Sequence, residues 1–250
     1  MTDTNDPQRA GADRARLAER LAGALHLAVA PVAISFLDDA PMQGEVEQFD
    51  APMSAPTPDG RAGRVPAGCV FWIHAATRTF ATAPEDHGNC SVGRYTHGLA
   101  SLEDVAANED VAALLESGWV TPEAVGTIPS VSQRPASIVY GPLAESGPDT
   151  DVVLMRVNGR QMMVLSDALP GLRIEGKPQC HIVAIAKEEG QVAASVGCAL
   201  SRARTGMRPE EMTVAVPAAR LAEVVDAVER TAAVDTVVAK YAAEDARRFT

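Results

Sequence analysis

Four cysteines are the residues of this 250-residue chain with the clearest capacity for chemistry. They form two pairs, Cys69 with Cys90 and Cys180 with Cys198, with twenty and seventeen residues between the partners. The second cysteine of each pair opens a similar phrase. Both "CSVGRYTHG" and "CALSRARTG" place arginine four positions and glycine eight positions after the cysteine. This ordered match indicates that a helix–strand unit has been duplicated, and internal repeats shape the whole fold of a chain.

A duplicated unit tends to pack about a pseudo-twofold axis, which would bring the four thiols together between the halves. Four thiolates suit a [4Fe–4S] cluster or a structural zinc ion. Cys69 and Cys180 are expected at helix N-termini, where the helix dipole stabilises a thiolate. Neither pair has the C-x-x-C spacing of a strong metal motif, and free cysteine often fills core space. The spacing alone therefore leaves metal ligands, catalytic thiols and core residues as open alternatives.

Basic and acidic side chains crowd the cysteine phrases. Arg94 and Arg202 are the matched arginines, and we expect them to hold an anionic group beside the thiols. His87 and His181 each lie within three residues of a cysteine, and neutral imidazole transfers protons readily. Glu85 is a candidate general base in the same turn as His87. Taken singly, each side chain is more often structural, but together they favour an active site.

Strands and helices alternate along the chain, which predicts a mixed α/β fold of two pseudo-symmetric halves in one globular unit. We expect a tail over 1–8, a first half-repeat over 9–133 and a second over 134–250. Helices are predicted over 9–27, 69–76, 101–115, 160–169, 179–189, 218–231 and 236–248, and strands over 31–37, 78–83, 136–143, 150–157, 191–197 and 211–217. A further helical stretch is predicted after Cys90. The stretches 38–68, 118–133 and 171–176 are predicted to lack regular structure.

Composition limits the classes of partner. The net charge of −11 argues against nucleic acid or an anionic membrane as the main partner, since both require a basic face. No apolar run is long enough to span a bilayer, and the polar start "MTDTNDPQ" does not resemble a secretion signal. We therefore expect a cytoplasmic protein whose partner is a small-molecule substrate or a redox protein. The oligomeric state is left open.

From about Leu17 to Val228 the chain resembles the family called domain of unknown function 169. The resemblance is carried by motifs that follow one another in the family's order: Pro31-Val32-Ala33, Cys69, Glu85-Asp86-His87 before Cys90, "IVYGPL" (138–143), Cys180, Ser195-Val196-Gly197-Cys198 with Arg202, and Glu210-Glu211-Met212 leading to Pro217. The resemblance implies that the four cysteines act as a set. It implies no particular reaction.

These observations together predict an iron–sulfur protein in which all four cysteines bind the cluster, with zinc as the alternative metal. We expect an enzyme of lyase or reductase type acting on a small anionic metabolite. Arg94 and Arg202 would bind the substrate, and His87, Glu85 and His181 would carry the catalysis. The alternatives are a non-catalytic zinc or closed-cluster protein for electron transfer or sensing, and a metal-free thiol-redox protein.

Overall fold

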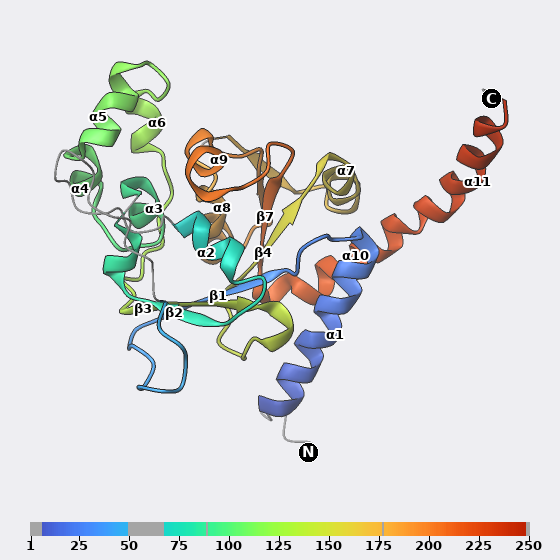
Figure 1. Ribbon diagram of the computed structural model, residues 1–250, viewed down its shortest axis with the longest axis horizontal. Coiled ribbons are helices and arrows are strands. Elements are labelled where there is room, and N and C mark those ends of the chain that lie inside the picture. The colour runs from blue at the N-terminus through green and yellow to red at the C-terminus, as the bar shows by residue number, and fades with distance from the viewer. Residues whose placement is uncertain (1–6, 50–67, 89, 177, 249–250) are drawn as a thin grey trace.

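The computed structural model describes residues 7–49, 68–88, 90–176 and 178–248, and its centre is one seven-stranded mixed sheet in the order β2-β3-β1-β4-β7-β6-β5 (Figure 1). The strands are β1 (Val32–Leu37), β2 (Phe80–Thr82), β3 (Ser137–Pro142), β4 (Val152–Val157), β5 (Arg173–Glu175), β6 (Ala193–Ser195) and β7 (Met212–Pro217). Neighbouring strands are antiparallel except β5 and β6, which are parallel. The predicted mixed α/β class is confirmed.

Helices cover both faces of this sheet. They are α1 (Pro7–Leu25), α2 (Gly68–His74), α3 (Ser91–Thr96), α4 (Leu102–Ala106), α5 (Glu109–Glu116), α6 (Pro122–Gly126), α7 (Gly159–Ala168), α8 (His181–Ala184), α9 (Ala199–Thr205), α10 (Leu221–Ala232) and α11 (Val234–Ala246). A π-helical turn, η3 (Ile185–Glu189), continues α8. No described helix is long and apolar enough to cross a membrane.

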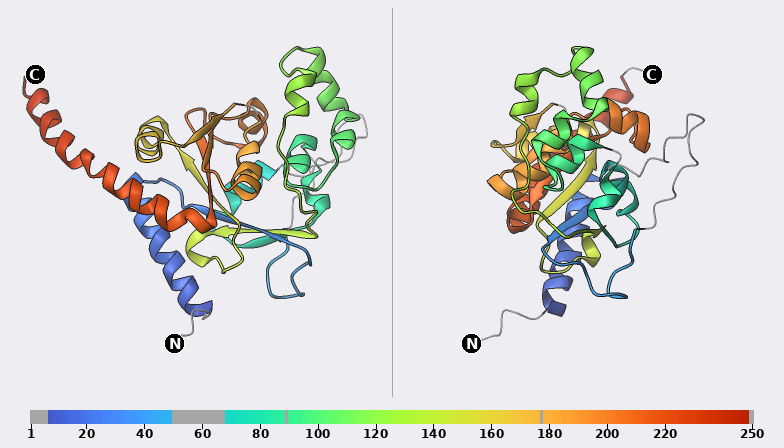
Figure 2. Two further views of the ribbon diagram at one scale, coloured as in Figure 1. Left: turned by 180° about the vertical axis from the view of Figure 1, so that it is seen from behind. Right: turned by 90° about the vertical axis from the view of Figure 1, so that its left-hand side faces the viewer.

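The central strands are apolar on both faces because each face packs against helices. In β1, Val32, Ile34 and Phe36 point into one core, which also contains residues of α2 and α8. Ala33 points into the other core, which contains residues of α1, α7 and α10. Figure 2 shows α1 and α10 side by side on this second face, with α11 continuing away from the sheet. Two-sided burial explains why such strands read as continuous apolar runs rather than as alternating ones.

The sheet has the same strand order on both sides of the central β1–β4 pair. Outward from β1 come β3 and β2, and outward from β4 come β7 and β6. The registers correspond as well, because Val32 pairs with Pro142 as Val152 pairs with Pro217. Each of these prolines ends its strand and is followed by a short 3-10 turn, η2 (Leu143–Glu145) or η4 (Ala218–Arg220). The fold therefore consists of two pseudo-symmetric halves. Strand β3 follows the expected boundary at residue 133, yet it pairs with β1 and β2 of the first half.

One segment has no counterpart in the other half. Between α3 and β3 the first half contains α4, α5 and α6, whereas residues 206–211 alone join α9 to β7. In Figure 1 these three helices stand together at one end of the molecule, beside α3. We call α4 to α6, with the turns between them, the cap.

Three expectations about local structure were wrong. The helix predicted over 101–115 is two helices, because α4 ends at its C-cap Ala107 and α5 begins at Glu109. The segment 118–133, predicted to be irregular, contains α6, which begins after the N-cap Thr121. Residues 173–175, predicted to be loop, form β5, because they pair with β6 at the sheet edge. A three-residue strand leaves no periodic signal in the sequence. Part of the predicted loop over 38–68 lies outside the described residues.

Candidate functional site

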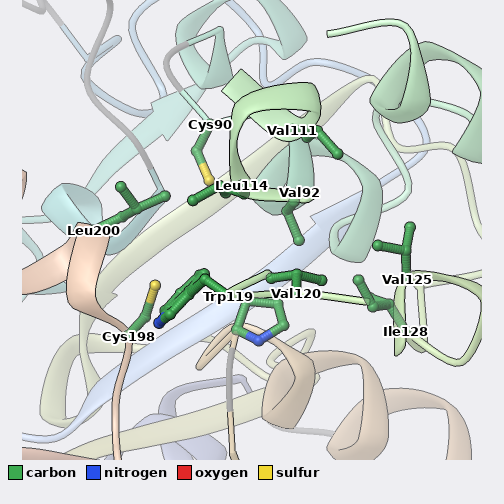
Figure 3. A pocket seen from close by; sticks show the side chains of 11 residues that line it. Cys90, Val92, Val111, Leu114, Trp119, Val120, Val125, Ile128, Cys198 and Leu200 are labelled. Carbon is green, nitrogen blue, oxygen red and sulfur yellow. The ribbon is translucent and has the colours of Figure 1, made fainter. Parts of the chain in front are cut away.

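All four cysteines lie at the beginning of a helix. Cys69 is the second residue of α2, and the other three are the N-caps of their helices: Cys90 of α3, Cys180 of α8 and Cys198 of α9. Helix α2 packs against α9, and α3 packs against α8, so each contact joins one half to the other. The crossed packing brings the helix starts together between the halves. In Figure 3 the sulfur atoms of Cys90 and Cys198 point toward one another.

The thiols share one electrostatic environment. Burial raises the pKa of Cys69, and the neighbouring Cys90 and Cys198 raise it further. Burial likewise raises the pKa of Cys180 well above its usual value, and the other three cysteines add to the effect. The expected stabilisation of thiolates by helix dipoles is therefore outweighed by burial and mutual repulsion. Both thiols are neutral at pH 7 unless a cation compensates their charge.

The side chains do not converge on a single point. Within the described residues, no three His, Cys, Asp or Glu side chains form a group that could hold one metal ion. A tetrahedral zinc site with Zn–S bonds of about 2.3 Å would bring the sulfur atoms to roughly 3.8 Å from one another. The four cysteines are in addition not joined by disulfides. The four thiols are separate, but they lie close enough to raise the pKa of Cys69 and Cys180.

His87 has one nitrogen whose protonation is fixed by its neighbours. Its Nε2 lies 3.0 Å from Thr82 Oγ1, and that hydroxyl donates its proton to the Ile138 carbonyl at 3.0 Å. Nε2 must therefore carry the proton and donate to Thr82, which leaves Nδ1 with a free lone pair. Nδ1 is buried and has no hydrogen-bond partner among the described residues. Burial, with the nearby His97 and Arg94, lowers the pKa of His87 well below its usual value, so the ring is neutral.

His97 has the opposite tautomer. Its Nδ1 donates to the Gly93 carbonyl at 2.8 Å, so Nε2 carries the lone pair. This Nε2 is buried, and no residue that the structure describes bonds to it. Burial lowers the pKa of His97 to about 4. Both imidazoles face the start of α2, since a Cβ atom on Gly68 would lie 3.7 Å from His87 Nδ1 and 3.9 Å from His97 Cε1. Two neutral acceptors thus adjoin the residue before Cys69.

Among the described residues, three further buried polar atoms near the thiols have no hydrogen-bond partner. They are Trp72 Nε1, Tyr140 Oη and Gln179 Oε1. Tyr140 belongs to the same environment, because burial and then Cys69 and Cys180 raise the pKa of its hydroxyl. Gln179 hydrogen-bonds to Cys69 and lowers the pKa of that thiol, although burial outweighs this effect. Sequence reasoning missed His97, Gln179 and Tyr140 as site residues. Only the position of Gln179 beside Cys180 offered a signal.

The two matched arginines have different surroundings. Arg202 donates to the backbone carbonyls of Val196 at 2.9 Å, Pro209 at 3.3 Å and Glu211 at 2.8 Å. Its guanidinium therefore ties the loop before Cys198 to the loop before β7. Arg94 makes no such bonds, and its Nε is buried without a partner among the described residues. The positive charge of Arg94 acts on His87, whose pKa it lowers.

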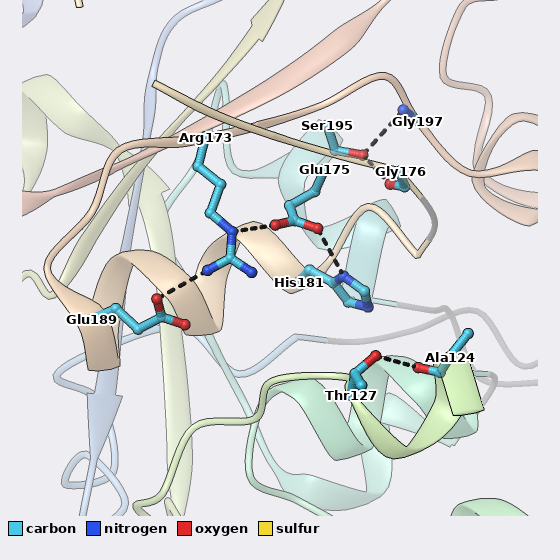
Figure 4. Close-up of polar contacts among 9 residues, drawn as sticks. All are labelled: Ala124, Thr127, Arg173, Glu175, Gly176, His181, Glu189, Ser195 and Gly197. Carbon is cyan, nitrogen blue, oxygen red and sulfur yellow. Dashed lines mark hydrogen bonds and ion pairs between the residues drawn. The ribbon is translucent and has the colours of Figure 1, made fainter. Parts of the chain in front are cut away.

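The remaining predicted catalytic residues lie apart. Glu85 is exposed in η1 (Pro84–His87), on the surface rather than at the thiols. His181 is buried, with Nδ1 3.9 Å from Glu175 Oε2, and Glu175 is bound in turn by Arg173 (Figure 4). Burial lowers the pKa of His181, and Glu175 partly offsets this. The structure thus brings His87, Arg94 and the cysteines together, and places His181 in a separate ion-pair network.

Comparison with known proteins shows the family to which the chain belongs. A family model matches residues 20–227, from α1 to α10, and the family is DUF169, described as "Uncharacterised ArCR". The match includes all four cysteines and the whole sheet, and it confirms the resemblance inferred from the sequence. No curated protein and no solved structure matches the chain.

Proposed function

Because the chain belongs to the DUF169 family, whose description gives no activity, we propose a function from the site alone. The four cysteines hold an iron–sulfur cluster, most simply [4Fe–4S], and the protein is an enzyme that acts on a small anionic molecule beside the cluster. A lyase or reductase reaction fits the residues available.

One observation carries this proposal: four thiols from two halves lie close enough to raise the pKa of Cys69 and Cys180, and several buried polar atoms near them have no hydrogen-bond partner among the described residues. A buried polar group without a partner costs about 1–3 kcal/mol, and native proteins contain few of them. Five such atoms in the described part of the chain are buried close to the thiols, and they belong to Trp72, His87, His97, Tyr140 and Gln179. An occupant that binds the thiols and accepts or donates hydrogen bonds would remove this cost.

The donor set fits a cluster better than a single ion. Thiolates are the ligands of iron–sulfur clusters, and a cluster's iron atoms separate the sulfur ligands more widely than one zinc ion does. The raised pKa of Cys69 and of Cys180 means that binding must release protons, so assembly depends on pH. A bound cluster whose four irons are all held by cysteine would supply one-electron chemistry. Backbone and side-chain donors near the thiols, among them Gln179, would stabilise the thiolate charge.

His87 and Arg94 add a hydrogen-bond acceptor and a positive charge to the thiols. The Nδ1 lone pair of His87 is fixed by the bond from Nε2 to Thr82, so it is placed to accept a hydrogen bond from a bound molecule at a defined position. The guanidinium of Arg94 lies close enough to lower the pKa of His87, and it provides positive charge for an anionic group. Arg202 is not part of this proposed set, because its donors bind backbone carbonyls.

Anaerobic purification followed by iron, acid-labile sulfide and zinc analysis tests the proposal. We expect a brown protein that contains both iron and sulfide, with an electron paramagnetic resonance signal after reduction. Replacing any of the four cysteines by alanine should lower the iron content, whereas Ser201→Ala, a buried change on α9, should not. Zinc without sulfide would favour the structural-metal alternative. A colourless, metal-free protein with redox-active thiols would overturn the cluster.

A further inference from the structure

A pocket lies between the cap and the cysteine helices. Val111 and Leu114 of α5, with Ile128 after α6, form its cap wall, and Trp119 lies on the turn between these helices. Cys90 and Cys198 line the opposite side, one from each half. Figure 3 shows both sulfur atoms directed toward the space beside Leu114 and Trp119. The cavity holds about 50 Å³.

The lining has an unusual composition for a site next to reactive groups. Apart from the two thiols, every lining residue is a valine, leucine, isoleucine, proline or tryptophan. Within the described ranges of the chain, no charged side chain and no hydroxyl lines the cavity. A buried water needs two to four polar partners, and apolar cavities of this kind stay dry or bind apolar molecules. The pocket is therefore built for a hydrocarbon group.

The wall that closes the pocket belongs to the cap, which occurs in the first half and not in the second. The cap occurs in the first half, between α3 and β3, and the corresponding connection in the second half is residues 206–211. The two halves supply the cysteines symmetrically, but the cap encloses them from one side. An inserted element over a reactive centre is a common means of selecting a substrate, because loops vary while the scaffold stays fixed.

We propose that this pocket binds the hydrocarbon part of the substrate, a short alkyl group, and holds the reacting end at the thiol centre beside Cys90 and Cys198. That the occupant is the substrate rests on the proposed function, whereas its apolar character rests on the lining alone. The substrate class is then a small molecule with one apolar group, which enters the cap side of the thiol centre. Any anionic group of the molecule lies outside this pocket, since a charge buried there would have no partner.

Methyl NMR of the full-length protein, labelled at isoleucine, leucine and valine, tests this inference with propane as the probe. Propane should shift the methyl signals of Val111, Leu114 and Ile128, while the exposed Val237 on α11 stays unchanged. Propionate and propylammonium have a similar chain but carry a charge, and they should bind on the order of tenfold more weakly or less well still. Equal binding of the charged probes would overturn the proposal.

Two variants show where the probe binds. Val125→Trp fills the pocket and should abolish the propane shifts, whereas Val237→Trp, the same change on an exposed helix, should preserve them. Leu114→Ala enlarges the cavity and should shift the preference from propane toward toluene by about tenfold. This second variant decides the matter if Val125→Trp does not fold. An unchanged preference in Leu114→Ala would contradict the assignment.

Iron analysis of the same samples separates the two proposals. Propane binding in a protein without iron would leave the pocket assigned and refute the cluster. An intact cluster in a protein that does not bind propane would refute the pocket and leave the cluster in place.

Discussion

At the scale of single residues, hydrogen-bond partners decide which groups are available for chemistry. His87 and His97 have opposite tautomers because Thr82 accepts from Nε2 of one and the Gly93 carbonyl accepts from Nδ1 of the other. In each ring the second nitrogen keeps its lone pair in a buried position. Both imidazoles are thus buried in the neutral form near the thiols, because burial in the folded protein lowers their pKa.

Burial of neutral His97 should make the protein acid-sensitive. Its pKa is about 4 when folded and 6.5 ordinarily, so between these values the unfolded chain binds the extra proton. Stability is therefore complete above about pH 6.5 and declines as the pH falls toward 4, by about 3 kcal/mol for this residue. His97→Gln should flatten the slope of unfolding free energy against pH by up to one proton, measured by urea unfolding. The exposed His74→Gln is the control, and an equal flattening in both variants would contradict the assignment.

The two matched arginines should respond differently to removal. Arg202→Ala leaves three backbone carbonyls without their donor and should lower stability by about 2–4 kcal/mol. Arg94→Ala removes a guanidinium with no bonded partner at Nε and should change stability by less than about 1 kcal/mol.

Thermal unfolding with and without phosphate distinguishes these effects. Phosphate should raise the melting temperature of the unaltered protein but not that of Arg94→Ala, whose iron content should stay unchanged. Retention of the phosphate effect in Arg94→Ala would remove the anion-binding role.

At the scale of elements, the position of Cys198 depends on a set of contacts around the loop before α9. Arg202, Glu211 and Arg156 form these contacts, which we call the brace. Gly197 has a φ of 121° and lies under Arg202, so closely that a Cβ atom would be 1.8 Å from Nη1 of that arginine. Glu211, whose carbonyl accepts from Arg202, is itself paired with Arg156 at 2.7 Å in a largely buried ion pair. The brace connects β4, β7 and α9, so it fixes one cysteine relative to the sheet.

Gly197→Ala should loosen this brace. The added methyl group both strains the backbone and displaces the guanidinium, at a combined cost of about 3 kcal/mol. Gly206→Ala is the matched control on the same helix, because Gly206 also has positive φ, at 75°, but no atom lies within 4 Å of its Cβ position. It should cost only about 1 kcal/mol. Chemical denaturation and iron content measure both variants, and equal losses would show that contact with Arg202 is unimportant.

At the scale of the whole molecule, the sheet and its two helical faces form one body, from which α11 extends. Helix α10 contributes Leu221, Val224, Val225 and Val228 to the core, whereas α11 has no buried residue. An ion pair of 2.7 Å between Arg160 and Asp235 joins the start of α11 to α7. The family match ends at residue 227, before α11 begins.

Truncation after Ala233 should therefore leave the body intact. We expect a loss of less than about 1 kcal/mol, since the removed ion pair is largely exposed, and no change in iron content. Truncation before Leu221 removes four buried side chains and should prevent folding. Circular dichroism melting of the two truncated chains tests this. A large loss of stability on truncation after Ala233 would mean that α11 has a stabilising contact in solution.

The sequence by itself determined the mixed α/β class, the central strands and the relation between the two cysteine phrases. These features are local or repetitive: an apolar run such as 31–37 and a fixed spacing from cysteine to arginine can be read without knowing what lies nearby. The tertiary structure alone decided which side chains face the thiols. Arg94 and Arg202 have the same spacing in the sequence, yet the backbone carbonyls that occupy Arg202 come from loops whose position depends on the folded sheet. Likewise β5 exists because β6 lies beside it, and the cap closes a pocket because folding brings it to α9. Hydrogen-bond partners and burial are set by residues distant in the chain, and local patterns do not contain them.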